Sequence, residues 1–176
     1  VVHLAATTHT YGEDMAMYRT NTDGVRNVID ALTPLEHVQA AIFTSTKLVV
    51  HTTYRQRHRE DYYADCCYGH SKVVGELLVR KATDLPCARI IVRPTSVWGP
   101  YSQYNAFFNS IARGVYANPG AENPPKSFGF VGNVVHELDR LLHAPREQVD
   151  DKLFYLSDYE VTTIRQWAKI ICDEMG

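Results

Sequence analysis

The residues best suited to chemistry are Tyr68 and Lys72, in the segment Tyr68-Gly69-His70-Ser71-Lys72. Residues four apart lie on one face of a helix, one turn from each other. A free tyrosine has a pKa near ~10 and is a poor base at neutral pH, but an ammonium group one turn away favours the phenolate and lowers that pKa. A phenolate can accept the proton of a substrate hydroxyl while hydride leaves the same carbon. The pair therefore predicts an acid–base site for oxidation and reduction of an alcohol carbon.

The spacing alone carries little information, because a surface tyrosine beside a solvated lysine is the ordinary alternative. The segment Phe43-Thr44-Ser45-Thr46 adds context, since it ends an apolar, strand-like run. Ligands of open α/β sheets bind at the carboxyl ends of the strands. A hydroxyl at this place can hydrogen-bond to the reacting substrate oxygen and polarise it.

The elements that would position these residues alternate along the chain. Apolar runs predict strands at 1–6, 38–45 and 88–92, the last ended by Pro94, and helical spacing of apolar residues predicts helices at 14–32 and 67–83. This alternation indicates a parallel sheet covered by helices. Continuous apolar strands fit a sheet that is buried on both faces.

The pattern becomes mixed after Gly99-Pro100. Helices are expected at 105–116, 134–142 and 162–175, a short strand at 153–156, and a loop at 118–126, where Pro, Gly and Asn are dense. We therefore expect residues 1–100 to form the sheet domain. Residues 101–176 would form mainly a mixed α/β lobe, some segments of which can return to the sheet.

Composition excludes several function classes. The 176 residues are 45% hydrophobic and 22% charged with a formal net charge of -2, which gives no electrostatic reason to expect nucleic acid or an anionic membrane as partner. No apolar run reaches the roughly 18 residues that a membrane span needs. The four cysteines lack zinc-ligand spacing and indicate reduced thiols in the cytoplasm, and the eight histidines show no ligand-like pairing, so no metal site is expected.

These segments together resemble the extended short-chain dehydrogenase/reductase family, and within it the NAD-dependent nucleotide-sugar epimerases and dehydratases. The resemblance is carried by ordered segments along the whole chain: Val2–Ala6, Asn21 and Gly24 within NTDGVRNVIDA, Phe43–Thr46, the Tyr68 and Lys72 pair, Arg93–Pro100 (RPTSVWGP) and Phe130–Val135 (FVGNVV).

The resemblance implies a Rossmann-like, doubly wound parallel sheet with a small C-terminal mixed α/β substrate lobe. The family's glycine-rich phosphate loop and the acidic residue after its second strand are absent from this sequence, which also begins directly in an apolar run. We therefore expect that N-terminal strands are missing. NAD is the expected cofactor and NADP the alternative, because the residue that distinguishes them is not present.

The resemblance also assigns roles to individual residues. The catalytic group would be Tyr68, Lys72 and Thr46, with Ser45 as the near alternative to Thr46, and Asn21 would support the backbone of the site. The cofactor would contact residues from four segments: Leu4, Ala5, Ala6, Thr44, Tyr68, Lys72, Pro94 and Val97. The substrate would contact Ser45, Thr46, Ser96 and Asn105.

The expected activity is epimerisation of a nucleotide-sugar by hydride transfer through a keto intermediate, in a cytoplasmic homodimer. Dehydration is disfavoured, because Lys47 and Leu48 stand where the dehydratases carry Asp-Glu. One alternative is an NAD(P)-dependent dehydrogenase or reductase of another hydroxy or keto compound, such as a steroid or flavonoid. Another is a non-catalytic cofactor-binding protein of the same fold.

Two further features have alternative readings. Asn105 could contact a substrate diphosphate at a helix N-terminus, or it could be a helix cap without a ligand. The arginines at 55, 57 and 59 could meet a phosphate, although a solvated loop is the favoured interpretation.

Overall fold

The computed structural model describes residues 1–118, 120, 123–158 and 160–175, which fall into two compact units. The first comprises Val1–Pro94 and Leu138–Tyr155. The second comprises the described residues of Thr95–Glu137 and Leu156–Gly176. The division expected near residue 100 thus falls after residue 94, and the segment 138–155 returns to the first unit.

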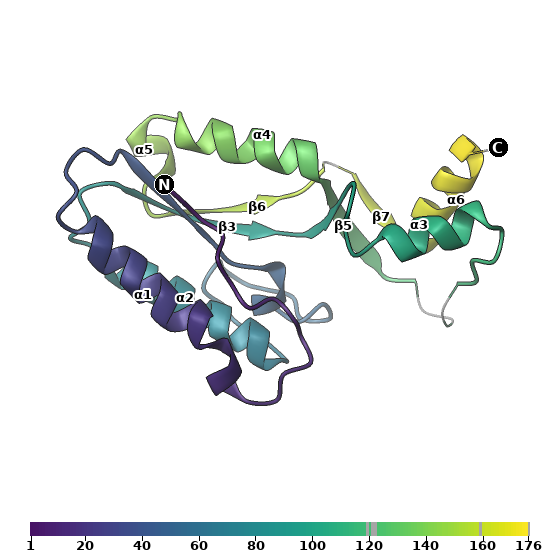
Figure 1. Cartoon of the computed structure of the whole chain (residues 1–176), viewed down its shortest axis with the longest axis horizontal. Coiled ribbons are helices and arrows are strands. Elements are labelled where there is room, and N and C mark those ends of the chain that lie inside the picture. Colours follow the sequence, from purple (N-terminus) through teal and green to yellow (C-terminus); the bar gives the residue numbers. More distant parts are fainter. Residues whose placement is uncertain (119, 121–122, 159, 176) are drawn as a thin grey trace. The chain divides into compact units, whose positions relative to one another are not determined.

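The first unit is built on a four-stranded sheet with the order β1-β2-β3-β6 (Figure 1). The strands are β1 (Val2–His3), β2 (Ala40–Thr44), β3 (Ala88–Pro94) and β6 (Lys152–Leu156). β1 pairs with β2 and β2 with β3 in parallel. All but the last residue of β2, and most of β3, are buried. The predicted parallel α/β fold is confirmed.

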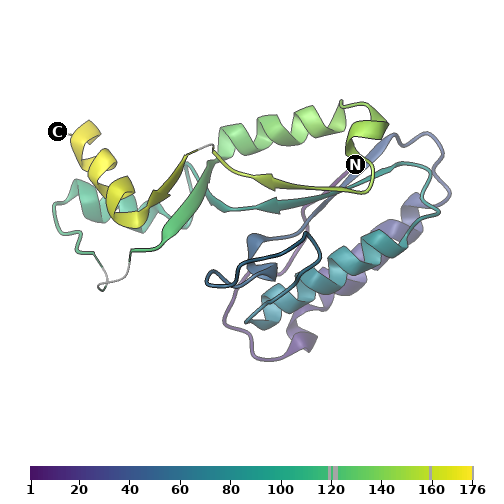
Figure 2. The same ribbon diagram turned by 180° about the vertical axis from the view of Figure 1, so that it is seen from behind.

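Helices cover both faces of this sheet (Figures 1 and 2). α1 (Arg19–Leu32) and α2 (Cys67–Lys81) run side by side on one face, while α5 (Arg146–Val149) packs against β3 from the other. A 3-10 turn, η1 (Met15–Tyr18), leads into α1, and the Asp14 carboxylate accepts a hydrogen bond from the Ala16 amide at its start. The predicted helix at 14–32 therefore has a 3-10 first turn.

The core lies between the sheet and the α1–α2 layer. Ala41 and Phe43 of β2 and Ile91 of β3 belong to one buried cluster with Val25 of α1 and Val79 of α2. The alternate residues of these strands, such as Ile42 and Ile90, are buried on the opposite face, as period-two geometry requires. Each such side chain contributes about 1.5–3 kcal/mol by leaving water, so this layer fixes α2 against the end of β2.

The second unit has a small sheet with the order β4-β5-β7. It contains β4 (Ser96–Trp98), β5 (Pro125–Phe130) and β7 (Val161–Thr163), with β4 and β5 parallel and β7 antiparallel to β5. α3 (Asn105–Ala112) and α6 (Ile164–Met175) pack together beside it. Trp167 is buried, with its ring stacked 3.9 Å from that of Phe128 and edge-on to that of Trp98.

Several predicted boundaries need correction in this unit. The predicted loop at 118–126 falls partly outside the described residues, and its last two residues, Pro125 and Lys126, begin β5. The predicted helix at 162–175 begins only at Ile164, because the two preceding threonines pair in β7. α4 (Val131–Leu142) begins three residues earlier than predicted. The short strands were missed since their pairing partners are distant in sequence.

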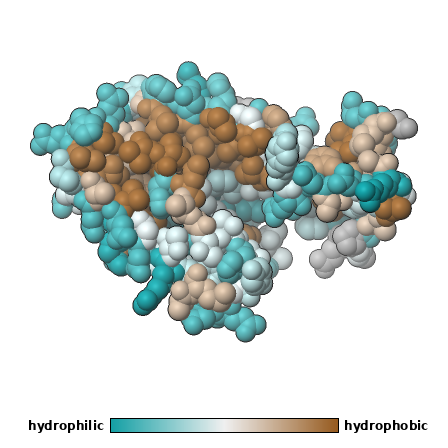
Figure 3. Space-filling view, in the orientation of Figure 1, coloured by the Kyte–Doolittle hydropathy of each residue, from teal (hydrophilic) through white to brown (hydrophobic). Residues whose placement is uncertain are grey.

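Exposed apolar residues gather at the β1 edge of the first unit, where Figure 3 shows a broad hydrophobic area. Val1 and Leu4, which flank β1, are 51% and 61% exposed. β1 spans two residues, fewer than the six predicted. No helix in the described part of the chain combines the length and apolar composition that crossing a membrane requires.

Candidate active site

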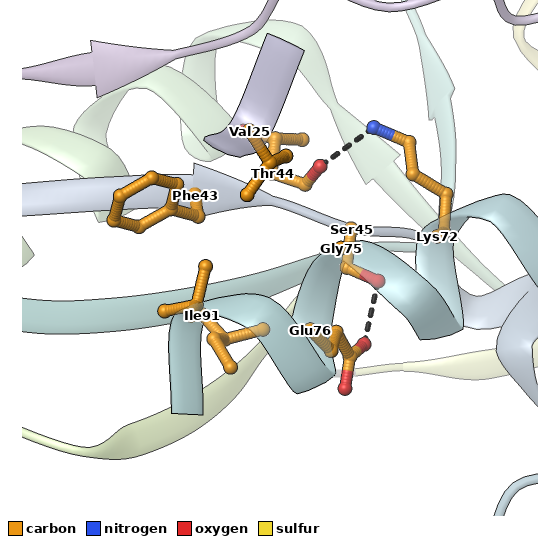
Figure 4. A pocket seen from close by; sticks show the side chains of 9 residues that line it. Val25, Phe43, Thr44, Ser45, Lys72, Gly75, Glu76 and Ile91 are labelled. Atoms are coloured by element: carbon orange, nitrogen blue, oxygen red, sulfur yellow. Dashed lines mark hydrogen bonds between the residues drawn. The ribbon is translucent and has the colours of Figure 1, made fainter. Parts of the chain in front are cut away.

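The carboxyl end of β2 and the first turns of α2 bring the expected catalytic residues to one place. The Lys72 ammonium donates a hydrogen bond of 2.8 Å to the backbone carbonyl of Thr44, the last residue of β2 (Figure 4). Lys72 is only 5% exposed and Thr46 8%. The lysine therefore connects α2 to the end of β2 by a hydrogen bond and does not lie in solvent.

Tyr68 lies one turn before Lys72 on α2 and is also buried. Its hydroxyl interacts with the side-chain hydroxyl of Thr46, which itself accepts a 3.3 Å hydrogen bond from the Leu48 amide. Tyr68 and Thr46 are thus brought together, with the Thr46 hydroxyl also capping the 3-10 turn η2 (Lys47–Val49). Ser45, the near alternative to Thr46, is directed elsewhere, toward Glu76.

The prediction that the Lys72 ammonium lowers the pKa of Tyr68 is wrong for the chain without cofactor or substrate. Burial raises the pKa of the Tyr68 hydroxyl above its ordinary value, and this effect outweighs the hydrogen bond with Thr46, which lowers it. The nearby Cys66 and Tyr18 raise the pKa of Tyr68 further. The phenol is therefore neutral at neutral pH.

Burial also changes Lys72, because desolvation disfavours its charged form. It lowers the pKa of Lys72 to about 8, while the Glu76 carboxylate acts in the opposite direction. Lys72 in turn contributes, after burial, to lowering the pKa of His3 on β1. The ammonium is retained at neutral pH with a small margin.

Asn21 of α1 supports the backbone of the site, as the resemblance implied. Its side chain forms two hydrogen bonds with the backbone of Thr7, accepting from the amide at 2.8 Å and donating to the carbonyl at 2.9 Å. It also donates to the Ser71 hydroxyl, which donates to the carbonyl of Tyr68. Asn21 is 1% exposed, so it ties the segment after β1 to the helix that carries Tyr68.

Sequence reasoning missed Glu76, a buried carboxylate one turn beyond Lys72. Its Oε1 accepts hydrogen bonds from Ser45 at 2.5 Å and Arg93 Nε at 2.8 Å, and its Oε2 accepts from Arg93 Nη2 at 2.8 Å and Tyr62 at 2.9 Å. Arg93 had been recognised within RPTSVWGP, but nothing local pointed to its partner. The spacing Lys72-x-x-x-Glu76 on one helix face was the available signal.

The residues expected to contact a cofactor lie around the carboxyl ends of β1 and β2. Leu4 and Ala5 are exposed and Ala6 is half-buried, just after β1. The Thr44 hydroxyl and the His3 Nε2 are buried without a hydrogen-bond partner among the described residues. Unpaired buried polar atoms of this kind call for a ligand or water, and with Lys72 they suit the hydroxyls and amide of a nicotinamide riboside.

The interface between β2 and α2 itself is closely packed. A cavity of about 10 Å³, room for about one water, is lined there by residues that include Val25, Thr44, Lys72 and Glu76 (Figure 4). A cofactor or substrate therefore has to lie beyond the strand ends and not between strand and helix.

The remaining predicted contacts follow β3. Pro94 is its half-buried last residue, while Ser96 and Val97 lie in β4 of the second unit. Asn105 is the first residue of α3, whose N-cap is Tyr104, so the interpretation of Asn105 as a cap is wrong. Asn105 instead lines a cavity of about 340 Å³ with Trp98, Gly99, Pro100, Phe108 and Asn109.

Two of the arginines before α2, Arg57 and Arg59, contact carboxylates. Arg57 forms a two-point contact with Asp61, at 2.8 and 3.1 Å, and the Arg57 guanidinium holds the pKa of that carboxyl well below its usual range. Arg59 lies 3.5 Å from both Glu60 and Asp151. These contacts support the solvated-loop interpretation of Arg57 and Arg59 over a phosphate site.

Comparison with known proteins places this geometry in a family. Over residues 1–176 the chain matches the family described as the 3-beta hydroxysteroid dehydrogenase/isomerase family. The chain belongs to that family. This confirms the expected membership of the extended short-chain dehydrogenase/reductase group. A search of curated protein sequences found no significant match.

Solved structures share the fold of this family member. UDP-N-acetylglucosamine 4-epimerase from Bacillus cereus has 19% sequence identity and a TM-score of 0.82. The alignment covers 99% of this chain and 63% of the epimerase chain. RMD from Pseudomonas aeruginosa, complexed with NADPH, is 21% identical with a TM-score of 0.80, covering 99% and 65%. UDP-glucuronic acid 4-epimerase from Bacillus cereus, in complex with UDP-glucuronic acid and NAD, is 19% identical with a TM-score of 0.76, covering 97% and 58%. The chain thus spans less than two thirds of the length of these proteins.

Proposed function

We propose that the protein is an NAD(P)-dependent, epimerase-type oxidoreductase that acts on a nucleotide-sugar by hydride transfer through a keto intermediate. One observation carries this proposal: the Tyr68 hydroxyl contacts the Thr46 hydroxyl at the carboxyl end of a parallel strand, where the buried Lys72, one helical turn after Tyr68 in α2, also binds the strand. This is where ligands bind in open α/β sheets.

Each of the three residues has a distinct role. Tyr68 exchanges the proton of the reacting substrate hydroxyl, and its neutral phenol protonates the keto oxygen in the reducing step. Thr46 orients that oxygen through its hydroxyl. Lys72 supplies positive charge and donors for the ribose hydroxyls, while nicotinamide, when bound, supplies the hydride acceptor. The unpaired Thr44 hydroxyl and His3 Nε2 are available to hold it.

The nucleotide-sugar assignment draws support from the solved structures. Two of them are named as 4-epimerases of UDP-N-acetylglucosamine and of UDP-glucuronic acid. Both NAD and NADPH occur among the complexes, so we propose NAD with NADP as the alternative. The homodimer and the cytoplasmic location remain predictions.

A second candidate is favoured by the family description, which names a hydroxysteroid dehydrogenase. The same Tyr68, Lys72 and Thr46 would then oxidise a free alcohol and release reduced cofactor. The third possibility, a non-catalytic cofactor-binding protein, is less well supported, because Tyr68, Lys72 and Thr46 all lie at the end of β2.

The test is a substrate comparison with the full-length protein and NAD or NADP. UDP-N-acetylglucosamine, UDP-glucuronic acid and a 3-beta-hydroxysteroid are supplied separately. Reduced nicotinamide is followed by absorbance and the sugar products by NMR. The proposal expects a sugar epimer without net cofactor reduction. Stoichiometric reduced cofactor from the steroid would support the second candidate, and dinucleotide binding without any turnover would contradict both.

A further inference from the structure

The Glu76 carboxylate is buried, and each of its oxygens accepts two hydrogen bonds. It is 2% exposed and accepts four hydrogen bonds, two from the Arg93 guanidinium and one each from Ser45 and Tyr62. Arg93 is itself completely buried and donates onward to the Tyr155 hydroxyl and the Arg59 carbonyl. A buried ion pair of this kind is weak evidence for stability, since apolar residues of similar size can serve as well.

The partners of Glu76 show what else the carboxylate does. Ser45 is adjacent to Thr46, and its amide donates to the Val92 carbonyl over 2.7 Å. Ser45 is therefore held by β3 on one side and by Glu76 on the other (Figure 4). This fixes the peptide that leads into Thr46.

Glu76 also follows Lys72 by one turn on α2, so the two side chains leave the same helix face. The groups found to interact with Lys72 are the Thr44 carbonyl and His3 from the strands and Glu76 from its own helix. Among these groups of the described residues, Glu76 supplies the carboxylate. Beyond it stands a second buried cation, Arg93.

We propose that Glu76 is a positioning residue of this site, whose carboxylate holds the end of β2 through Ser45 and balances the positive charge of the buried Lys72. The proposal rests on the catalytic roles proposed for Thr46 and Lys72, which Glu76 serves without touching substrate. In agreement with this role, the Glu76 carboxylate raises the pKa of Lys72, whereas burial lowers it.

The experiment is an NMR titration of the Lys72 side-chain nitrogen in ¹⁵N-lysine-labelled full chain, without cofactor or substrate. The resonance is assigned by its loss in Lys72→Gln. Glu76→Gln removes the negative charge and keeps the shape. Tyr62→Phe is the matched control, because it removes one hydrogen bond to the same carboxylate and leaves the charge.

The proposal expects Glu76→Gln to lower the Lys72 midpoint by about one pH unit, a roughly tenfold fall in the ammonium-to-amine ratio. Tyr62→Phe leaves the midpoint near its wild-type value. An unchanged midpoint in both variants would overturn the proposal and leave Glu76 a structural partner of Arg93. Should Glu76→Gln fail to fold, the double variant Glu76→Gln, Arg93→Gln is compared with Arg93→Gln alone, so that the two proteins differ only in the charge of Glu76, and the comparison is judged by the same two outcomes.

The titration requires no turnover, so its outcome is independent of the substrate comparison. A lowered Lys72 midpoint in Glu76→Gln, together with a wild-type protein that shows no turnover, would support the positioning role of Glu76 and contradict the proposed reaction. An unchanged midpoint in an active enzyme would do the reverse.

Discussion

The ammonium of Lys72 donates to the carbonyl of Thr44 over 2.8 Å, which joins α2 to the end of β2 inside the protein. The contact places a cation where only 5% of the lysine is exposed. A buried charge held in this way has a cost in folding free energy, and that cost depends on pH.

Lys72→Met should therefore stabilise the protein near neutral pH. Burial lowers the pKa of Lys72 from 10.5 to about 8, so between these values the unfolded chain binds more protons than the folded one and stability rises with pH. Below pH 8 the wild type bears the full cost, about 3 kcal/mol from the shift, offset by about 1 kcal/mol from the hydrogen bond to Thr44.

The measurement is chemical denaturation of wild type and Lys72→Met from pH 7 to pH 10.5. The variant should be more stable by about 2 kcal/mol at pH 7, and this advantage should vanish toward pH 10.5. A difference that stays constant with pH would show that the lysine is not desolvated.

Two helical glycines provide a matched pair of substitutions. A Cβ on Gly69 would lie 2.5 Å from the Leu48 carbonyl oxygen, whereas a Cβ on Gly24 would meet nothing within 4 Å. Gly69→Ala should destabilise the protein and separate Tyr68 from Thr46, because α2 must move away from η2. Gly24→Ala should stabilise it by about 0.5–1 kcal/mol, the usual helix gain.

Thermal unfolding of both alanine variants checks this prediction. Equal effects at the two positions would contradict the close approach of α2 to η2. A loss of stability or of self-association in Gly24→Ala would instead indicate that another chain packs on that face of α1.

Asn21→Ala should lower stability by roughly 2–3 kcal/mol, because it removes the two hydrogen bonds to Thr7 and the one to Ser71 from a buried place. Asn27→Ala is the control, since Asn27 is exposed on the same helix. Denaturation midpoints and amide exchange at Thr7 report the effect. Unchanged protection of the Thr7 amide in Asn21→Ala would contradict the hydrogen bonds between Asn21 and the Thr7 backbone.

The sequence located the parts of the site that are encoded by short segments. Tyr68 and Lys72 share a helix, and Phe43–Thr46 ends an apolar strand, so each segment could be recognised locally, while the family resemblance supplied their grouping into one site. The alternation of strands and helices predicted the parallel sheet for the same reason.

Features that depend on tertiary packing could not be predicted from local sequence patterns. Glu76 and Arg93 come from α2 and β3, and their contact exists only after the sheet has formed. The direction of the Tyr68 pKa depends on how deeply the hydroxyl is buried, which a helix-face argument does not contain. β7 has only three residues, and the pairing of β5 with β7 across more than thirty residues left no periodic signal.

The most direct test of the account is the turnover of Tyr68→Phe in the full-length protein, with Tyr11→Phe as an exposed control. Both variants are compared with wild type for dinucleotide binding and for turnover of the substrate found active. The account predicts that Tyr68→Phe abolishes turnover while dinucleotide binding remains nearly unchanged, and that Tyr11→Phe behaves as wild type. Undiminished turnover in Tyr68→Phe would contradict it.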